Sequence, residues 1–383
     1  MAIIRQLTIG HRRWDTRIWV KEVATLRDAG LLSAYEVADG QGDAFVGGVE
    51  IRDLGKRKGR GFWPRVRHVI QALRKSGLRR EEVLHFHDPL FLPAAIWLKI
   101  KGYRIVYDVH EDYPRQVLNW ELPVFIRYGA SLSYAFLEWL AGRLFDGIVT
   151  ATPKIAERFP SKKTVVVQNF PVLGELSIDH PIAYLERPPI VTYIGGITRV
   201  RGIKEIVRAM GMLPNDMKVK LILAGSFDPL HLENEVSQQE GWKKVQYCRW
   251  QPRNRIAKLL ANTRVGLVLF HPAPNHIEAQ PNKLFEYMSA GIPVVASDFP
   301  LWRKIVEDVG CGLLVDPKDP SAIAGAIQWL LEHPKEAEAM GQRGRQAVED
   351  HFNWDKEAIK LLKFYQKRCN LRARRHIEVP SEN

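Results

Sequence analysis

The stretch "HIEAQPNKLFEYMSAG" at residues 276–291 runs directly into "IPVVASD" at residues 292–298. Proline is tolerated in the first turn of a helix and asparagine caps free N–H groups, so Pro281 and Asn282 predict a helix start, and Gly291 predicts its end. The apolar run at 292–296 is typical of a buried parallel strand. These residues predict a helix-to-strand unit with Glu278 in the preceding loop and Glu286 about one turn inside the helix.

Two carboxylates beside a helix start indicate the kind of ligand to expect. The N-terminus of a helix attracts phosphate because its free N–H groups and its dipole are both positive there. Carboxylates accept hydrogen bonds from hydroxyl groups. The combination favours a ligand that carries both phosphate and sugar hydroxyls.

Strand-like and helix-like segments alternate on both sides of this unit, which predicts parallel α/β sheets. Residues 16–29 are one of the amphipathic helical segments expected between the strands. Residues 169–189 break the alternation and are predicted to be a linker. We therefore expect two Rossmann-like domains facing across a cleft, with ligands at the carboxyl ends of the strands. The predicted domains are 1–172 together with 354–383, and 173–353, because a last helix near 354–368 is expected to cross back to the first domain. The predicted strands are 3–9, 33–38, 49–54, 82–87, 104–110, 146–151, 164–170, 190–196, 218–225, 244–250, 265–270, 292–297 and 312–317.

Composition narrows the class of protein. The chain has 383 residues, of which 46% are hydrophobic, and three well-separated cysteines. This predicts two globular domains without disulfides or a zinc site, in a reducing cytoplasm. The apolar stretch within the first fifteen residues is too short for a signal peptide. The longest apolar run, residues 89–98, is about half as long as a membrane span.

The net charge of +13 is concentrated rather than spread. Between Arg52 and Arg80 there are eleven Lys or Arg and one acid, and residues 363–375 add six more cations. Residues 56–80 place aromatic and aliphatic side chains at helical spacing beside this charge, which is typical of a helix lying on an anionic membrane. The alternative is an ordinary amphipathic helix packed on the sheet. The residues expected to face the membrane are Arg57, Lys58, Arg60, Trp63, Arg65 and Arg67.

The second domain begins with "YIGGITRVRGIKEIVRAM" at residues 193–210. Gly195 and Gly196 follow a predicted strand, and a helix is expected to begin near Gly202. Glycines allow a phosphate to approach the backbone, and Arg199 and Arg201 supply positive charge. The alternative is a purely structural turn, since such turns are common in α/β proteins.

Glu278 and Glu286, with seven residues between them, resemble the E-x7-E signature of retaining glycosyltransferases of the GT-B fold, in particular glycosyltransferase family 4. The resemblance covers nearly the whole chain and is closest to the branch that makes bacterial polysaccharide and O-antigen. Six further segments occur in that branch's order: "TIGHRRWDTRIWVKEVATLRDAG", "LHFHDPLFLP", "RIVYDVHEDYPRQ", "DGIVTATPKIAERF", "VVVQNFP" and "YIGGITRVRGI".

The resemblance implies a role for individual residues. Glu286 would bind the ribose of a nucleotide sugar, Glu278 would hold a hydroxyl of the transferred sugar, and His110 would reach the donor sugar and leaving phosphate as a catalytic residue. The donor site would comprise Gly195, Gly196, Arg199, Arg201, Asn282, Lys283, Leu284 and Glu286. The acceptor side would comprise His11, Asp15, His87 and Glu111.

The chain departs from the family pattern at Gly196, where an arginine is usual. We expect Arg199 or Lys283 to supply the missing charge. No Asp-x-Asp stands where a metal would bridge the diphosphate, so metal-independent, retaining transfer without a cofactor is expected. His85 and His87 face the same side of a strand, and without a third ligand at a fitting spacing we favour structural or acceptor-side roles for them over metal binding.

The leading functional prediction is a cytoplasmic enzyme on the inner face of the cell membrane that moves a sugar from a nucleotide sugar to a lipid-linked or glycan acceptor in bacterial surface polysaccharide synthesis. UDP-sugars are the favoured donors and GDP-sugars the alternative, with the base near residues 246–252. A sugar-nucleotide epimerase or hydrolase of the same fold is a rival. A basic nucleic-acid-binding protein is a remote one, because no nucleic-acid-binding motif is present.

Overall fold

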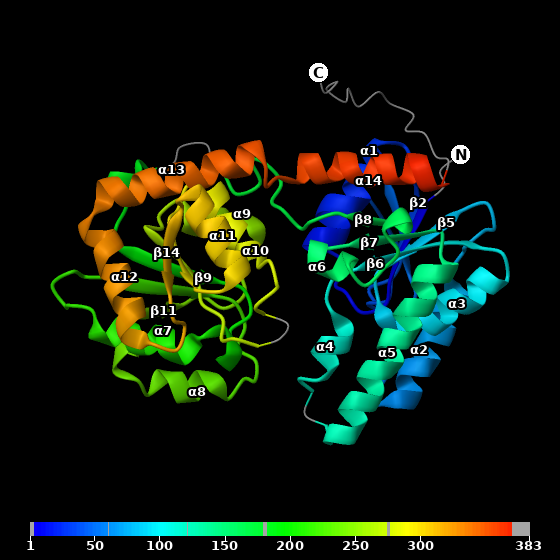
Figure 1. Ribbon diagram of the computed structural model, residues 1–383, viewed down its shortest axis with the longest axis horizontal. Helices are drawn as coiled ribbons and strands as arrows, with labels where there is room; N and C mark the ends of the chain where they lie inside the picture. The colour runs from blue at the N-terminus through cyan, green and yellow to red at the C-terminus, as the bar shows by residue number, and fades with distance from the viewer. Residues whose placement is uncertain (1–3, 60, 121, 179–181, 274–275, 370–383) are drawn as a thin grey trace. The chain divides into compact units, whose positions relative to one another are not determined.

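The computed structural model describes residues 4–59, 61–120, 122–178, 182–273 and 276–369. The chain divides into two compact units (Figure 1). Unit 1 is 1–169 with 355–383, and unit 2 is 170–354. The division falls after Asn169, where the sequence placed it after residue 172, and the return to unit 1 falls after Trp354 rather than before it.

Unit 1 is built on an eight-stranded sheet in the order β3-β4-β2-β1-β5-β6-β7-β8. Every neighbouring pair is parallel except β3 and β4, an antiparallel hairpin. The short strand β3 was not predicted, because its three residues alternate too briefly to give a signal. The strands are β1 (Ile4–Thr8), β2 (Leu32–Val37), β3 (Ala44–Val46), β4 (Val49–Asp53), β5 (Val83–Phe86), β6 (Arg104–Val109), β7 (Gly147–Thr150) and β8 (Thr164–Val166).

The helices of unit 1 differ from the expected pattern in one place. Residues 16–29 form a π-helical segment, η1 (Thr16–Val23), before the short α1 (Ala24–Asp28), where one regular amphipathic helix was expected. Helices α2, α3 and α5 pack on one apolar cluster over the sheet, which includes Ala72, Ala95, Leu98 and Ala141. The remaining bounds are α2 (Phe62–Lys75), η2 (Pro89–Phe91), α3 (Leu92–Ile100), α4 (Tyr113–Val117), α5 (Val124–Leu144), α6 (Pro153–Ala156), η3 (Ser161–Lys163) and α14 (Trp354–Cys369).

Unit 2 contains a six-stranded, wholly parallel sheet in the order β11-β10-β9-β12-β13-β14. Its strands are β9 (Ile190–Ile194), β10 (Lys220–Ala224), β11 (Val245–Tyr247), β12 (Val265–Val268), β13 (Val294–Ser297) and β14 (Gly312–Val315). Its helices are η4 (Tyr184–Glu186), η5 (Arg199–Arg201), α7 (Ile203–Met212), α8 (Leu232–Ser237), η6 (Glu240–Lys244), α9 (Arg253–Leu260), α10 (Asn282–Ser289), α11 (Pro300–Val309), α12 (Pro320–Glu332) and α13 (Pro334–Asp350).

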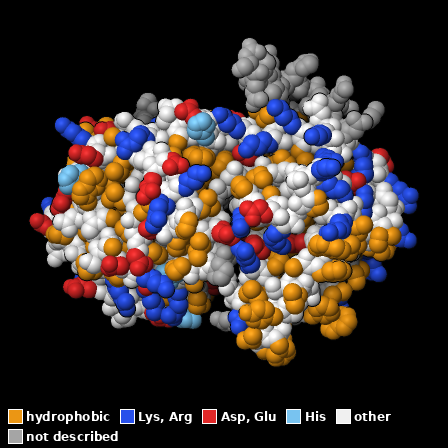
Figure 2. All heavy atoms as spheres, in the orientation of Figure 1, with side chains coloured by type: hydrophobic (Ala, Val, Ile, Leu, Met, Phe, Trp, Pro, Cys, Tyr) orange, Lys and Arg blue, Asp and Glu red, His pale blue; other side chains and the backbone are white. Residues whose placement is uncertain are grey.

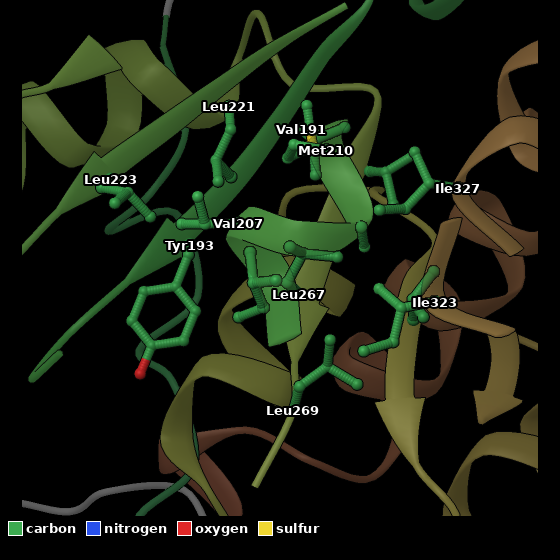
Figure 3. Packing of buried hydrophobic residues seen from close by; sticks show 14 of the residues in the cluster. Val191, Tyr193, Val207, Met210, Leu221, Leu223, Leu267, Leu269, Ile323 and Ile327 are labelled. Carbon is green, nitrogen blue, oxygen red and sulfur yellow. The ribbon is translucent and has the colours of Figure 1, made fainter. Parts of the chain in front are cut away.

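The core of unit 2 is apolar on both faces of its sheet. Figure 3 shows one of them: aliphatic side chains of β9, β10 and β12 meet those of α7 and α12, with Tyr193 at the edge of the group. Burial of apolar surface contributes about 25 cal/mol per Å², so such a core is the main stabilising element of the unit.

Both sheets follow the doubly wound order in which the chain starts in the middle, proceeds to one edge, returns and proceeds to the other edge. In unit 1 the order reverses between β1 and β5, and in unit 2 between β9 and β12. Ligands of such sheets bind beyond the carboxyl ends of the strands at this switch point. The predicted fold, two Rossmann-like parallel-sheet domains of the α/β class, is confirmed.

The last helix, α14, belongs to unit 1. Its Tyr365 hydroxyl makes a short hydrogen bond to Nδ1 of His85 in β5, and its Phe364 ring lies against Gly147 of β7, where a Cβ would come within 2.2 Å of the ring. Glu357 accepts a hydrogen bond from the backbone N–H of Gln168. Within the described residues, none of the helices is long and apolar enough to span a bilayer.

Candidate functional site

The switch point of unit 2 is formed by the turn after β9 and the loop after β12. Gly195 directly follows β9 with φ +103°, a conformation that favours glycine. Gly202 lies in the left-handed region at φ +69° and precedes the first residue of α7, as the sequence predicted. The Gly195–Gly196 turn therefore leaves backbone open at the position where a doubly wound sheet binds phosphate.

Lys283, in the first turn of α10, projects over this turn. Its ammonium lies 3.5 Å from the centre of the Tyr193 ring, and a Cβ on Gly195 would stand 3.7 Å from the ammonium. The side chain is buried, and its Nζ has no hydrogen-bond partner. Burial, reinforced by nearby Arg201, lowers the pKa of Lys283 well below that of an ordinary lysine. A buried amine without an acceptor is costly, and an anion placed at Gly195 would remove that cost.

The two arginines of the turn differ. Arg199 forms a short ion pair with Glu235 of α8, which also binds Lys204 at 2.7 Å. Arg201 instead reaches the Gly196 carbonyl oxygen at 3.3 Å and lies 5.2 Å from the centre of the Phe270 ring. Lys283 and Arg201 are thus directed toward the turn, whereas the charge of Arg199 is already compensated elsewhere.

The start of α10 differs from the prediction for Asn282, and the burial of Leu284 restricts the part that its side chain can play in a donor site. Pro281, not Asn282, is the N-cap residue, and no side chain caps the helix, so Asn282 is the first helical residue and is exposed. Leu284 is fully buried in the core, so its side chain has no surface for a ligand. Glu278 lies in the loop before α10 and Glu286 about one turn inside it, as predicted.

Glu286 has a partner that no sequence motif predicted. Nη1 of Arg253, the first residue of α9, donates to Oε1 of Glu286 at 2.6 Å. The same guanidinium binds both carboxylate oxygens of Glu175, at 2.7 and 3.0 Å. Although burial opposes the charged form, Glu286 and Glu175 together raise the pKa of Arg253. These three residues are far apart in sequence and follow no motif spacing.

The segment expected near the nucleobase follows β11. Arg249 has φ +56°, and its carbonyl oxygen accepts from the Gly225 N–H at 2.8 Å, which brings the segment beside the carboxyl end of β10. Trp250 is 61% exposed. It therefore offers an aromatic surface on which a base could stack.

The switch point of unit 1 brings together histidines that lie far apart in the sequence. His11 follows β1, His87 follows β5 and His110 follows β6. The rings of His11 and His110 have centroids 4.9 Å apart, and those of His87 and His110 are 5.0 Å apart. The predicted catalytic histidine and two of the predicted acceptor-side residues thus form one cluster.

Beneath this cluster lies a buried network centred on Asp108. Arg17 binds both oxygens of Asp108, at 3.1 and 2.9 Å, and contacts Glu22 at 3.0 Å. His110 Nε2 lies 3.1 Å from Asp108 and 3.0 Å from His87 Nδ1. Burial alone would raise the pKa of Asp108, but Arg17 and His110 hold it well below its ordinary value. Arg17 therefore neutralises most of the charge that Asp108 could offer to His110.

His87 is enclosed rather than open to a ligand. It is 1% exposed, its Nε2 makes a short hydrogen bond with the Gln6 side chain, and burial lowers its pKa well below the ordinary value. A neutral, buried His87 fits the structural role that the sequence left open and gives no direct contact with an acceptor.

His11 is paired with a different carboxylate, Asp88. The two lie 3.3 Å apart, Oγ1 of Thr8 donates to Asp88 at 2.9 Å, and the Ile9 N–H donates to Asp88 at 2.6 Å. A Cβ on Gly10 would come within 2.4 Å of the Asp88 carboxylate, so only glycine lets the chain pass over it. Burial acts to lower the pKa of His11, but Asp88 outweighs it and raises the pKa.

Two other predicted acceptor-side residues have less distinctive surroundings. Asp15 is the N-cap of η1 and accepts from the N–H groups of Arg17 and Ile18 at 2.9 and 3.0 Å. Its carboxylate therefore stabilises the start of η1. Glu111 is exposed, one residue after His110.

The structure also supplies possible partners for the His85–His87 pair, for which the sequence showed no third metal ligand. One ligand atom each from Glu22, His85, His87 and Asp108 all lie within 4.8 Å of one another. Arg17 contacts both carboxylates of this group and supplies a positive charge there. Burial, together with the charge of Asp108, raises the pKa of Glu22 well above its ordinary value, which limits the negative charge that this group could offer to a metal ion.

The basic segment of unit 1 is only partly accounted for by packing. Val66, Val69 and Leu73 of α2 are half-buried, whereas Phe62 and Trp63 are each 69% exposed. Arg57, Lys58 and Arg67 are exposed, and Arg65 lies 5.7 Å from the centre of the Trp120 ring. Arg60 falls outside the described residues. Packing therefore accounts for one side of α2, and the membrane interpretation stays a prediction.

Comparison with known proteins agrees with the geometry of unit 2. Residues 178–347 match the family described as glycosyl transferases group 1. The alpha-maltose-1-phosphate synthase of Mycolicibacterium smegmatis is 31% identical over 208 residues, 51% of each protein. The phosphatidyl-myo-inositol mannosyltransferase of Mycobacterium leprae is 35% identical over 294 residues, 74% of this chain and 73% of the relative.

In fold, the chain is similar to Anabaena HepE, whose crystal structure contains UDP and glucose. The TM-score is 0.73 at 14% identity, with 96% of this chain and 100% of HepE covered. The chain spans about half the length of the first curated relatives that it matches. The long alignment with the mycobacterial mannosyltransferase and the match across unit 2 lead to one conclusion: the chain belongs to the group 1 glycosyltransferase family.

Proposed function

We propose that this protein transfers a sugar from a nucleotide-diphosphate sugar to a lipid-linked or glycan acceptor in bacterial surface polysaccharide synthesis. The observation that carries the donor half is Lys283: a buried amine without a hydrogen-bond partner, at the N-terminus of α10 and over Gly195. A diphosphate is the anion that fits a helix N-terminus, an open glycine turn and two nearby cations.

Each donor-site residue has a proposed task. Lys283, Arg201 and the N–H groups of α10 bind the diphosphate, and Gly195 and Gly196 let it reach the backbone. Glu286 accepts hydrogen bonds from the ribose, and Glu278 holds a hydroxyl of the transferred sugar. Because negative charge on the diphosphate grows as the glycosidic bond breaks, fixed positive groups stabilise the transition state more than the ground state.

Arg201, and Lys283 once a bound anion favours its protonated form, support metal-independent transfer, in which no divalent ion has to bridge the diphosphate and no cofactor takes part. Retention of configuration at the sugar is proposed from family membership. The rival activities, an epimerase or a hydrolase, would need no acceptor, so transfer that depends on acceptor concentration would separate them.

UDP is the favoured nucleotide, with the base against Trp250. HepE, similar in fold, binds UDP and glucose, which supports this choice. A mannosyl donor carried by GDP is the second candidate, because the mycobacterial relative that aligns over most of the chain is a mannosyltransferase.

We assign acceptor binding to unit 1 and donor binding to unit 2, and we propose that unit 1 rests on the anionic inner face of the cell membrane. Helix α5 carries large exposed apolar side chains along its length, including Phe125 at 76% and Leu132 at 71% exposure. In Figure 2 hydrophobic side chains gather over the region of α2, α3 and α5. The exposed cations of α2 and the loop before it complement anionic lipid, which attracts each nearby Lys or Arg by up to about 1 kcal/mol.

The donor proposal is tested by thermal stability with UDP, GDP and ADP, each with the wild type, Lys283→Met and Glu286→Ala. A nucleotide at 100 times its dissociation constant stabilises by about 2.7 kcal/mol. We expect one nucleotide to raise the melting temperature of the wild type and to lose most of its effect on both variants. Lys304→Met, which removes an exposed lysine of α11, is the matched control. Equal shifts in all four proteins would refute the assignment.

The membrane proposal is tested by sedimentation with vesicles of phosphatidylglycerol and phosphatidylethanolamine. We expect binding at low salt that high salt reverses, and loss of binding in Phe62→Ser/Trp63→Ser and in Phe125→Ser/Leu132→Ser. Leu230→Ser removes an exposed leucine of unit 2 and should leave binding unchanged. Failure of the wild type to bind these vesicles at low salt would contradict the membrane proposal.

A further inference from the structure

The loop that carries Glu278 is anchored to the core of unit 2 by a tryptophan. Nε1 of Trp302, in the first turn of α11, donates a hydrogen bond to the carbonyl oxygen of Ala279 at 2.7 Å. Trp302 is fully buried, whereas residues 276–280 of the loop are half-buried. A buried indole N–H needs an acceptor, and here the acceptor belongs to a loop rather than to a helix or strand. The bond therefore ties the residue next to Glu278 to the folded core.

Other contacts of this loop are either local or apolar. The Ala279 N–H donates to the carbonyl oxygen of His276 at 3.1 Å, within the loop itself. The His276 ring meets the Phe270 ring edge-on, with centroids 5.0 Å apart. A turn shapes a loop and apolar packing covers it, but a hydrogen bond also fixes its direction. Trp302 adds such a directional bond from outside the loop, one residue after Glu278.

The ring of Trp302 lies behind a different part of the candidate donor site. It packs edge-on against Phe270, with centroids 5.4 Å apart. The side chain of Ser297 holds the Phe270 backbone, because its oxygen accepts from the Phe270 N–H at 2.8 Å and donates to the Phe270 carbonyl at 2.9 Å. Arg201 and Lys283 lie 5.2 and 5.4 Å from the centre of the Phe270 ring. The ring of Trp302 thus supports the side of the two cations, and its N–H supports the side of Glu278.

We propose that Trp302 is a positioning residue for the transferred sugar: its indole N–H fixes the loop that carries Glu278 and thereby sets which sugar the donor site accepts. This inference rests on the proposed function, in which Glu278 holds a hydroxyl of that sugar. A carboxylate discriminates between sugar epimers only while it stays in a fixed place, since a displaced carboxylate binds the hydroxyls of both epimers poorly. Loss of the N–H should therefore weaken binding of the sugar and leave binding of the nucleotide unchanged.

Trp302→Phe tests this separation, because phenylalanine keeps an aromatic ring beside Phe270 and removes the donor. Titration calorimetry measures the dissociation constants of UDP and GDP and of the epimeric pairs UDP-glucose and UDP-galactose, GDP-mannose and GDP-glucose. We expect the ratio of the constant for the preferred nucleotide sugar to that for its nucleoside diphosphate to rise about two- to tenfold, as for one lost hydrogen bond. Discrimination between the two epimers should fall, and the nucleoside diphosphate should bind as it does to the wild type.

Two further variants show whether the effect is specific to the sugar. Lys283→Met should weaken binding of the nucleoside diphosphate and of the nucleotide sugar by the same factor, so that their ratio stays at the wild-type value. Trp329→Phe, at a partly exposed tryptophan of α12, should match the wild type in every constant. A wild-type ratio in Trp302→Phe, or an equal loss of affinity for nucleotide and nucleotide sugar, would overturn the inference.

A second substitution guards against a folding defect in Trp302→Phe. Benzothienylalanine in place of Trp302 keeps the shape of the double ring and has sulfur where the indole has N–H. It should raise the same ratio without lowering the melting temperature measured with the nucleoside diphosphate bound, and an unchanged ratio would overturn the inference. If the wild type bound neither nucleotide nor any of the four nucleotide sugars, the proposed function itself would be contradicted and this inference with it.

Discussion

The centre of unit 2 is apolar on both faces of its sheet, whereas the middle strands of unit 1 hold a chain of buried charged and polar groups. In unit 2 the candidate donor residues lie mainly at the turn after β9 and the start of α10, beside an aliphatic core. In unit 1 the polar groups continue inward from the histidines through Asp108, Arg17 and Glu22, and a second buried group joins Arg5 to Glu36 and Glu82. The same strand order thus supports two arrangements: in unit 2 the candidate site is separate from the stabilising core, and in unit 1 the candidate site and the buried network share residues.

This difference predicts the largest effect for Arg17→Met. Removal of the guanidinium leaves Asp108 as a buried carboxylate without its main cation, which should destabilise unit 1 by about 3–5 kcal/mol. Chemical denaturation measures it. Arg74→Met, which removes an exposed arginine of α2, should change stability by less than about 0.5 kcal/mol. The double variant Arg17→Met/Asp108→Asn should lose less than Arg17→Met alone; an equal or greater loss would mean that the charge is not the cause.

The counterpart in unit 2 is Leu267→Ala. Leu267 is fully buried in β12, so the lost methyl groups and the remaining cavity should cost about 3 kcal/mol, within the usual range for leucine-to-alanine changes. Leu230→Ala, at an exposed leucine, serves as the control. Unlike the loss in Arg17→Met, this loss should be the same at every pH where unit 2 is folded. A strong pH dependence would break the proposed contrast between the units.

Acidification should lower the free energy of unfolding of unit 1 more than that of unit 2, by less than the two core substitutions do. Asp108, Asp88 and Glu82 of unit 1 all have pKa values below their ordinary ones because, although burial opposes it, cations and hydrogen bonds favour their ionised forms. Below about pH 4 the unfolded chain therefore binds more protons than folded unit 1, and the free energy of unfolding falls. Glu22, with a raised pKa, opposes this in part.

In unit 2 the described carboxylates with lowered pKa, Glu235 and Asp298, are near the surface. Hydrogen exchange measured by mass spectrometry at stepwise lower pH should thus show unit 1 losing protection first. Simultaneous loss in both units, or earlier loss in unit 2, would count against the buried network as the cause.

The smallest predicted effect concerns Glu175→Gln. Glu175 holds Arg253, which in turn holds the ribose-binding candidate Glu286. Without the charge of Glu175, Arg253 should bind Glu286 less rigidly and nucleotide affinity should fall about two- to fivefold, as expected for a half-exposed ion pair. Titration calorimetry with the nucleotide found in the thermal assay measures this. Glu307→Gln, which changes an exposed carboxylate of α11, should have no effect; equal affinities for the two variants would remove Glu175 from the site.

The sequence predicted the fold because local patterns encode it, and the same kind of pattern predicted that the candidate donor residues lie around one helix start. All thirteen predicted strands are present, and Glu278, Lys283 and Glu286 lie within a span of nine residues around a single helix start. What remained hidden depends on distant contacts. Arg253 contacts both Glu286 and Glu175 although no motif spacing links the three residues. Arg199 forms an ion pair with Glu235, whereas the Nζ atom of Lys283 has no hydrogen-bond partner, and neither feature follows from a local pattern.

In unit 1, part of the buried polar network could have been predicted from the sequence. Asp108 lies on β6 two residues before His110, as His85 lies on β5 two residues before His87, so a period-two pattern could have placed all four on one face. Asp88 could have been noted only for its place beside His87 at the same strand end, not from the period-two pattern. Arg17 and Glu22 could not, because η1 is π-helical and the regular helical spacing assumed for residues 16–29 does not hold there.

The return of α14 to unit 1 has a consequence for the order of events during synthesis. Phe364 and Tyr365 lie against β7 and β5 of the first sheet, but they are made only after the whole of unit 2. On the ribosome, unit 2 can complete its core while unit 1, whose strands were made earlier, still has Gly147 and His85 uncovered. The half of the protein that is translated first is therefore the half that finishes folding last.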